Sequence, residues 1–348
     1  MYTLVYIYIF YGSISLFYRL ILFKKTFIYC IIILVGKGDF MALFSNKYSS
    51  FKNSIINVVS KIDINDSNYV PQGICYAEGY YFLTMYDFTK KTNSVLWIYK
   101  DGEVVKKIKL DNKYHCGGIS YNKDSESIFI TGKGEKNHSY VQKYGLSYLL
   151  YEFNEEELKC KSSYEVDYDN SLYSSAAKHS SPSFLTCFDD YLYVGNYCSC
   201  EDLNKCYIKK FKILKNGSLS KSFDIIKNPF SNTQSLCVFK YNGELLYLFS
   251  RSFGRKRNSL IHVCKLVNSD FIIVSTMVLP AMLEQVSLCE DNFVLIFESC
   301  SRLFRKTALT VNDEIYLISI DNVLNTKDKY KDFCKGTSVF VKNSKYKY

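Results

Sequence analysis

Residues 71–84 read PQGICYAEGYYFLT, a polar opening followed by two short apolar and aromatic runs around the turn Ala77-Glu-Gly79. Tyr, Phe and Ile at strand length, separated by turn residues, are typical of a β-hairpin. A similar hairpin follows His115-Cys-Gly-Gly-Ile119, with its turn at Asn122-Lys-Asp124. The recurrence predicts repeated antiparallel β-structure.

Three further copies of this unit follow along the chain. The five polar openings are Pro71-Gln-Gly-Ile74, His115-Cys-Gly-Gly-Ile119, Ser181-Pro-Ser-Phe184, Thr233-Gln-Ser-Leu236 and Leu283-Glu-Gln-Val286. Aligned on Gly73, Gly118, Ser183, Ser235 and Gln285, they are spaced by 45, 65, 52 and 50 residues. A period of about 40–50 residues with about four strands per unit is typical of β-propeller blades.

The sequence therefore predicts an all-β fold, a single β-propeller domain over residues 41–348 with five blades between about 70 and 330. A sixth blade in the 65-residue interval is the alternative, because Tyr148–Phe153 resembles a strand. We prefer a loop or helical insertion there, since no second opening motif lies within it. Residues 55–64 are expected to supply a strand that closes the ring.

Composition limits the classes of function. The chain has 348 residues, of which 48% are hydrophobic and 22% charged, so wholesale disorder is excluded. Its formal charge of +10 comes mostly from dispersed lysines, so no nucleic-acid partner is expected. The 13 cysteines include no paired C-x-x-C, and most lie in apolar runs, which favours free buried thiols in a reducing compartment.

The first forty residues differ from the rest. Residues 1–18 carry no charge, and the second apolar run, 26–36, follows Lys24 and Lys25. One interpretation is a hydrophobic membrane anchor within 1–40, with membrane association through residues 1–36. The other is an N-terminal extension outside the true protein, with translation starting at Met41 and a cytoplasmic location. A cleaved secretory signal beginning at Lys24 is a third alternative.

Several motifs resemble a group of uncharacterised β-propeller proteins, chiefly from low-GC Gram-positive bacteria. The matching stretches are Val70-Pro-Gln-Gly73, Asn93-Ser-Val-Leu96, His115-Cys-Gly-Gly-Ile119, Ser183-Phe-Leu-Thr186, Ser250-Arg-Ser-Phe-Gly-Arg255, Met282-Leu-Glu284 and Leu295-Ile-Phe-Glu-Ser299. The resemblance spans about residues 69–320 and implies the propeller fold but no activity. Cys116 and Gln285 depart from it, standing where the group tends to have a small aliphatic residue and a glycine.

The innermost strand of each propeller blade lines a central channel, so the residues that open the repeats should converge on one axis. These residues are Gln72, His115, Ser181, Gln234 and Glu284. The ends of the second strands add Asp87, Lys133, Asn196, Arg251 and Glu298, with Arg251 or Arg255 as the expected partner of a glutamate. The set predicts a ligand-binding site at the channel mouth.

Two classes of function follow. The first is a binding or scaffold protein that takes a small molecule or peptide at the channel mouth. The second is a metal-assisted hydrolase of an ester, lactone or phosphate, in which His115, Glu284 and Glu298 would hold a divalent cation in the channel. Serine hydrolysis and P-loop nucleotide binding are disfavoured, because the chain has no Gly-x-Ser-x-Gly elbow and Gly132-Lys-Gly134 is too short for a phosphate loop.

Overall fold

The computed structural model describes part of the chain. The described residues are 10–11, 14–15, 48–64, 67–133, 139–154, 156–160, 162–166, 182–199, 206–330 and 342–343. The chain divides into two compact units, residues 1–49 and 50–348. The second unit contains five antiparallel sheets of four or five strands, which is the architecture of a five-bladed β-propeller.

The blades follow one another in chain order. The first contains β4 (Tyr69–Ala77), β5 (Tyr80–Asp87), β6 (Val95–Lys100) and β7 (Glu103–Leu110), and the second β8 (Ile119–Asn122), β9 (Ser127–Lys133), β10 (Ser139–Gly145) and β12 (Ser162–Glu165). The third contains β13 (Pro182–Phe188), β14 (Tyr191–Asn196), β15 (Tyr207–Ile213) and β16 (Leu219–Lys227). The fourth contains β17 (Thr233–Tyr241), β18 (Glu244–Arg251), β19 (Ser259–Val267) and β20 (Asp270–Leu279), with β24 (Lys342–Asn343) at its edge. The fifth contains β21 (Leu283–Cys289), β22 (Asn292–Phe297), β23 (Glu314–Ser319) and β3 (Ile55–Lys61).

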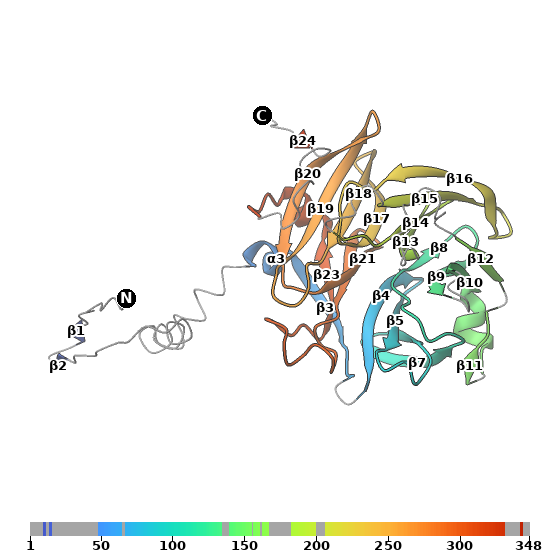
Figure 1. The fold of residues 1–348 in the computed structure, drawn as a ribbon, viewed down its shortest axis with the longest axis horizontal. Helices are drawn as coiled ribbons and strands as arrows, with labels where there is room; N and C mark the ends of the chain where they lie inside the picture. The colour runs from blue at the N-terminus through green and yellow to red at the C-terminus, as the bar shows by residue number, and fades with distance from the viewer. Residues whose placement is uncertain are drawn as a thin grey trace. The chain divides into compact units, whose positions relative to one another are not determined.

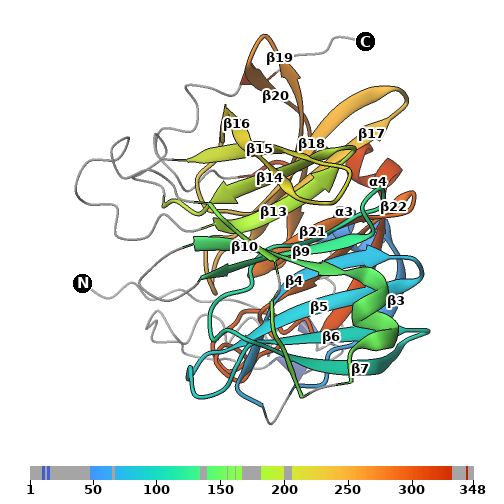
Figure 2. The same ribbon diagram turned by 90° about the vertical axis from the view of Figure 1, so that its right-hand side faces the viewer.

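The five sheets surround one axis. Figure 1 shows them succeeding one another around the centre, and Figure 2 shows β4 to β7 side by side in one sheet. The inner strands β4, β8, β13, β17 and β21 contact one another in that order, and β21 contacts β4 to complete the circle. The predicted all-β, five-bladed propeller is confirmed.

The fifth blade joins the two ends of the domain. Its outermost strand, β3, lies within the stretch 55–64 expected to close the ring and pairs antiparallel with β23, for example Ile315 with Ser60 and Leu317 with Asn57. The short helix α3 (Ser49–Ser54) precedes β3, and α4 (Ile320–Asn325) follows β23. A blade built from both chain ends prevents the ring from opening without loss of its ladder hydrogen bonds.

The long second repeat contains an insertion and not a sixth blade. Tyr148–Glu152 forms the single-turn π-helix η2, and β11 (Glu157–Leu158) then runs parallel to β7 at the outer edge of the first blade. The chain returns as β12 to the outer edge of the second blade. The preferred prediction of a loop or helical insertion is therefore confirmed, and the apolar side chains of Leu149, Phe153 and Leu158 pack into the core between these blades.

The inner strands are tied together by side chains. The amide of Gln285, which is 1% exposed, donates from Nε2 to the carbonyl of Ile119 at 2.8 Å and accepts from the N–H of Ile74 at 3.2 Å and of Ile119 at 3.3 Å. One residue of the fifth blade thus bonds to the first and second blades. In the same way, Ser235 Oγ accepts from the N–H of Val286 at 3.0 Å. These bonds satisfy backbone groups that no neighbouring strand can reach.

The core lies between adjacent blades. Separate apolar clusters fill the contact of the fifth blade with the first, the first with the second, the second with the third and the third with the fourth. Many of the aromatic residues are used here. The fully buried phenylalanines are Phe82, Phe129, Phe184, Phe230, Phe239, Phe249, Phe293 and Phe297.

Little of the N-terminal unit is described. Two short strands, β1 (Phe10–Tyr11) and β2 (Ile14–Ser15), pair antiparallel. No helix in the described part of the chain is both long and apolar enough to cross a membrane. The predicted anchor in residues 1–36 lies almost wholly outside the described residues and stays a prediction.

We predict that Gly118→Ala lowers the free energy of unfolding by about 1–3 kcal/mol, because overpacking against backbone cannot relax easily. A Cβ at Gly118 would stand 2.5 Å from the nitrogen of Leu185 and 2.8 Å from Cα of Phe184. The control is Gly145→Ala, where the nearest atom, Tyr148 Cβ, is 3.8 Å away and the expected change is within about 0.5 kcal/mol. Urea unfolding of both variants tests this, and equal stabilities would contradict the close approach of β8 to β13.

Candidate functional site in the central channel

A β-bulge recurs at the start of the inner strands. The register between the inner and second strands shifts at Gln72 in β4, at Ser183 in β13, at Gln234 in β17 and at Glu284–Gln285 in β21. A bulge leaves a residue without a ladder partner and changes the direction of its side chain. Each bulge therefore releases the polar opening residue from the sheet at the same end of the propeller. In the second blade, His115 lies in the segment just before β8 and faces the same cavity as the bulged residues of the other blades.

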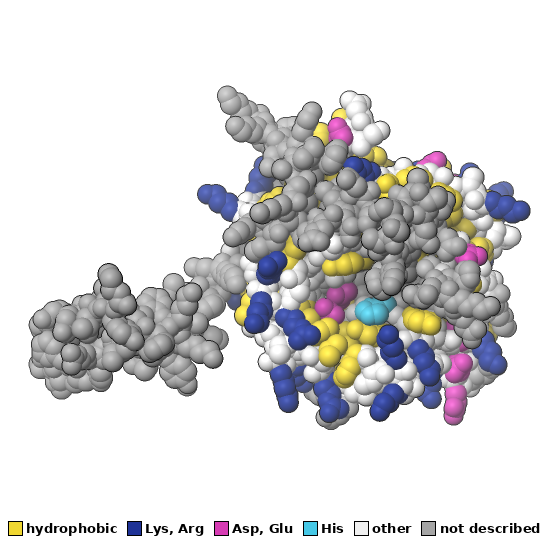
Figure 3. All heavy atoms as spheres, in the orientation of Figure 1, with side chains coloured by type: hydrophobic (Ala, Val, Ile, Leu, Met, Phe, Trp, Pro, Cys, Tyr) yellow, Lys and Arg dark blue, Asp and Glu magenta, His cyan; other side chains and the backbone are white. Residues whose placement is uncertain are grey.

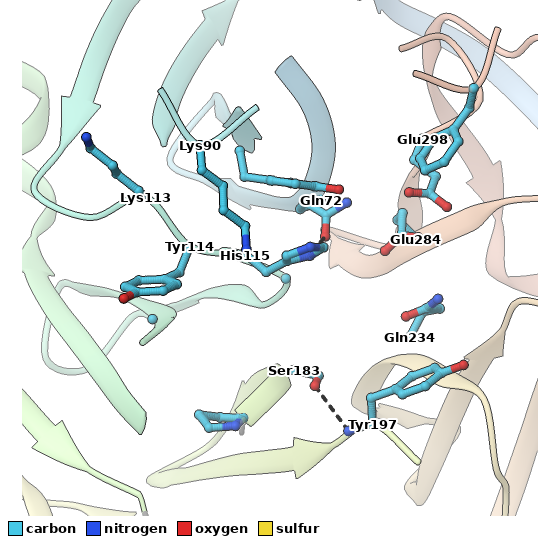
Figure 4. Close-up of a pocket in the computed structure, with 15 residues that line it drawn as sticks. Gln72, Lys90, Lys113, Tyr114, His115, Ser183, Tyr197, Gln234, Glu284 and Glu298 are labelled. Carbon is cyan, nitrogen blue, oxygen red and sulfur yellow. Dashed lines mark hydrogen bonds between the residues drawn. The ribbon is translucent and has the colours of Figure 1, made fainter. Parts of the chain in front are cut away.

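These residues line one cavity of about 560 Å³ at the channel mouth. Its wall comprises Gln72, Tyr86, Lys90, Lys113, Tyr114, His115, Gly117, Gly132, Pro182, Ser183, Tyr197, Gln234, Glu284, Glu298 and Phe304. Figure 4 shows the labelled side chains pointing into this space from several blades, with Tyr197 N–H donating to Ser183 Oγ at 3.1 Å. Ser183 thus occupies the place expected for Ser181, which lies outside the described residues.

Glu284 and Glu298 form a hydrogen-bonded carboxyl pair on one side of the cavity. Leu283 of β21 pairs antiparallel with Phe297 of β22, so Glu284 in the bulge and Glu298 just beyond β22 lie diagonally across the end of this hairpin, within reach of each other. Burial, and next the charge of Glu298, raise the pKa of Glu284 well above its ordinary value. Burial also raises the pKa of Glu298 to about 7, although its bond to Glu284 and the charge of Arg255 oppose this. The pair therefore shares one proton at neutral pH.

His115 lies across the mouth from this pair (Figure 4) and is open to the cavity. Its Nδ1 is 2.7 Å from Gln72 Oε1, while Gln72 Nε2 donates to the carbonyl of Pro71 at 2.8 Å. An amide oxygen only accepts, so His115 must donate from Nδ1. Loss of hydration, and next the charge of Lys90, lower the pKa of His115. The imidazole ring stacks on the ring of Tyr86, with 3.8 Å between the centroids. Neutral His115 consequently presents the lone pair of Nε2.

The rim of the mouth is basic. Figure 3 shows acidic side chains and a histidine in a central hollow, with lysines and arginines spread around it. Lys90 and Lys113 line the cavity itself, and Lys90 reaches toward His115 (Figure 4). Arg255 packs over the ring of Phe304, with its guanidinium carbon 4.7 Å from the centroid, and donates to Thr307 Oγ1 at 3.1 Å. Negative charge in the hollow is thus bordered by positive charge at its edge.

Asp87, expected in the channel, has a structural role. Its carboxylate accepts from the N–H and hydroxyl of both Thr89 and Thr92, at 2.7–2.9 Å. Although burial raises the pKa of Asp87, these four bonds outweigh it and lower the pKa to about 2. Asp87 therefore holds the loop after β5 and does not line the cavity.

Asn196 and Arg251 also lie away from the cavity. Asn196 is buried, and its side-chain oxygen accepts from Tyr207 N–H at 2.9 Å, which fixes the start of β15. Arg251 is fully buried with its guanidinium carbon 5.0 Å from the ring centroids of both Phe230 and Phe253. Neither arginine forms the expected ion pair with a glutamate of the channel, and Arg255 influences Glu298 only through its charge. The side chain of Lys133 lies outside the described residues.

The proposed metal ligands do not gather around one point. Among the described residues, no group of three His, Cys, Asp or Glu side chains is close enough to hold a metal ion. His115 is bonded to Gln72, whereas Glu284 and Glu298 are bonded to each other. Cys198 and Cys206 form a disulfide, which corrects the expectation of free thiols at these two positions.

Several lining residues carried no sequence signal. Tyr86 lies one residue before the predicted Asp87, and Tyr197 lies one residue after the predicted Asn196. In these two blades the side chain that lines the cavity therefore belongs to the neighbour of the residue predicted to do so. Strand alternation sends neighbouring residues to opposite faces, and the sequence does not reveal which member of each pair faces the axis. Lys90 and Phe304 come from loops, where no periodicity exists.

Comparison with known proteins identifies no family for the chain. No protein-family description matches the chain, and no curated protein matches its sequence. Similar solved structures include a glutaminyl cyclase from Myxococcus xanthus, 8% identical, covering 76% of this chain and 94% of its own at a TM-score of 0.46. A thermostable family-43 glycoside hydrolase is 9% identical over 74% and 91%, at a TM-score of 0.44. A functionally unknown protein from Desulfotomaculum acetoxidans is 10% identical over 67% and 63%, at a TM-score of 0.38.

These similarities are of fold alone. The chain is an all-β five-bladed propeller by its own sheet topology. No sequence family is identified, so the chemistry of the channel rests on its own residues.

We predict that Glu298→Gln changes how stability depends on pH. The folded chain keeps a proton on Glu298 up to about pH 7, whereas the unfolded chain releases it near 4.5, so the wild type loses stability as pH rises through this window. The glutamine variant lacks this loss, and its stability relative to wild type should increase by up to about 3 kcal/mol between pH 4.5 and 7. His115 acts in the opposite direction but is common to both proteins.

Urea unfolding at pH 4.5, 5.5 and 7 measures the difference. The matched control is Glu103→Gln, an exposed glutamate on β7, which should follow the wild type at every pH. A Glu298→Gln profile parallel to the wild type would contradict the raised pKa.

Proposed function

We propose that the protein is a binding protein whose channel mouth takes a small polar molecule. The observation that supports this most is the repetition of the bulge: the inner strands of four blades each turn out one polar residue, and the second blade contributes His115, all into one cavity. A bulge interrupts ladder pairing, so four blades would not each lose this pairing for packing alone. The volume of about 560 Å³ also suits a small ligand.

A short peptide is a second occupant of the same mouth. A shallower hollow of about 320 Å³ adjoins the cavity and shares Tyr197, Gln234 and Glu298 with it. This hollow extends past Ser252 toward Arg257 at the rim. A ligand with a compact end in the channel could therefore place an extended part over the fourth blade.

Metal-assisted hydrolysis remains the alternative function. A catalytic ion would need about three protein ligands and an open position. The Glu284–Glu298 pair offers carboxylate oxygens and His115 offers the lone pair of Nε2, but among the described side chains these three do not lie close enough together to hold one ion. Elemental analysis of the purified chain, with Glu284→Ala/Glu298→Ala as the comparison, separates this function from simple binding.

We predict that a compound from a panel of amines, amino acids, sugars and dicarboxylates at millimolar concentration raises the melting temperature of the purified chain, because ligand binding stabilises the folded state. Gln234→Ala, which alters a half-buried lining residue, should weaken the effect at least tenfold in concentration. Lys123→Ala is the control, since Lys123 lies on the exposed turn after β8, at the other end of the inner strand.

Scanning fluorimetry provides the first measurement and calorimetry the affinity. The proposal fails if no member of the panel stabilises the chain. It also fails if the stabilisation is identical in wild type and Gln234→Ala, because the ligand would then bind elsewhere.

A further inference from the structure

We infer that the molecule held at the channel mouth carries a primary ammonium group, bound by the Glu284–Glu298 pair against the rings of Tyr86 and Tyr197. The inference rests on the proposed binding function and specifies its ligand. Five polar residues in a cavity would suit many compounds, but the charge and shape of this side of the cavity favour a cation.

The carboxyl pair carries a negative charge that the protein does not neutralise by contact. Glu284 is 6% exposed, and its carboxyl partner is Glu298. Among the described residues, neither glutamate takes part in an ion pair within 4.0 Å, and no backbone N–H donates to either carboxylate. Placing a carboxylate in such a site is costly without a partner. An ammonium group entering the cavity would supply that partner.

Aromatic rings flank the same pair. Burial, and next the charges of Glu298 and Glu284, raise the pKa of the Tyr86 hydroxyl. Burial also raises the pKa of the Tyr197 hydroxyl, and the two glutamates add to this effect although the bond from Asn232 opposes it. Both tyrosines therefore lie close enough to the pair for the charges of the two glutamates to act on their hydroxyl groups. Carboxylates combined with aromatic faces are the arrangement that recognises ammonium groups.

Other ligand chemistries fit this side less well. An anion would be repelled by the pair, and a metal ion would lack a third ligand among the described side chains. Amides and hydroxyls would satisfy the hydrogen bonds of a neutral sugar, and the negative charge of the carboxylate would then have no cationic partner. The neighbouring Phe304 already accepts the guanidinium of Arg255 on its face, which shows that a cation is accommodated beside the pair.

The basic rim restricts which amines enter. Lys90 and Lys113 line the opposite part of the cavity, and Arg255 and Arg257 lie at the rim. A polyamine would meet these charges, whereas a monoamine with a neutral or anionic remainder would not. The expected ligand is thus a monoamine, and an anionic group at its far end would face Lys90.

The test uses pairs of small probes on the full chain: propylamine with propanol, phenethylamine with phenethyl alcohol, and alanyl-alanine with N-acetylalanyl-alanine. At least one amine should bind tenfold or more tightly than the partner that lacks the ammonium group, measured by calorimetry at pH 8. Glu298→Gln should remove most of this preference, and Lys123→Ala should leave it unchanged.

Affinity should also rise by about tenfold or more from pH 5.5 to pH 8, because the ammonium requires the carboxylate form of the pair. The raised pKa values of the Tyr86 and Tyr197 hydroxyls keep both neutral over this range, and the lowered pKa of His115, whose ring stacks on Tyr86, keeps the imidazole neutral as well. The other charged side chains that act on these groups are Arg255, on Glu298, and Lys90, on His115. The Glu298→Gln variant should lose this rise, which separates it from titration elsewhere.

The outcomes are distinguishable. If sugars or dicarboxylates bind in a manner sensitive to Gln234→Ala while no amine exceeds its uncharged partner, the inference is overturned and the proposed function stands. If no compound binds, both fail. If an amine binds equally to wild type and Glu298→Gln, the site is elsewhere and the inference is overturned.

Discussion

The structure depends on how the five inner strands satisfy their backbone groups near the axis. A strand at the centre of a propeller pairs with one neighbour in its own blade and leaves its other edge unpaired. Here side chains from the next blades bond to that edge: Gln285 to Ile74 and Ile119, Ser120 Oγ to the N–H of Cys187 at 2.9 Å, and Ser235 to Val286. These bonds fix the distance between blades and so define the channel.

The same constraint produces the site. Strands this close leave no room for a Cβ at Gly117, where the carbonyl oxygen of Ser183 would be 2.4 Å away, so glycines follow His115. The bulges in four of the blades then each direct a polar residue into the remaining space, and the second blade adds His115. Because Glu284 and Glu298 lie diagonally across the end of the β21–β22 hairpin, their carboxyls interact, and burial and the charge of Glu298 raise the pKa of Glu284. A packing requirement of the ring thereby generates an electrostatic feature suited to a cation.

Much of this could be predicted from the sequence, and the exceptions have physical reasons. The repeats at Gln72, His115, Gln234 and Glu284 were recognisable because a polar opening before an apolar run recurs every 45 to 65 residues. The prediction that Asp87 lines the channel was wrong, because the alternation of side chains along a strand does not reveal which of its two faces lies toward the axis. Tyr86, the preceding residue, lines the cavity instead. Gln285 stood out as an unusual residue, but its bonds span 166 positions to Ile119 and could not be deduced from local pattern.

The shared proton of the carboxyl pair is the central claim, because both the stability of the mouth and its preference for an ammonium group depend on it. Carbon-13 NMR of glutamate side-chain carboxyls, assigned with Glu284→Gln and Glu298→Gln, measures it most directly. The account predicts that Glu298 titrates near pH 7 while Glu284 keeps its proton at neutral pH. Two independent titrations near the ordinary glutamate pKa of about 4.3 would contradict it.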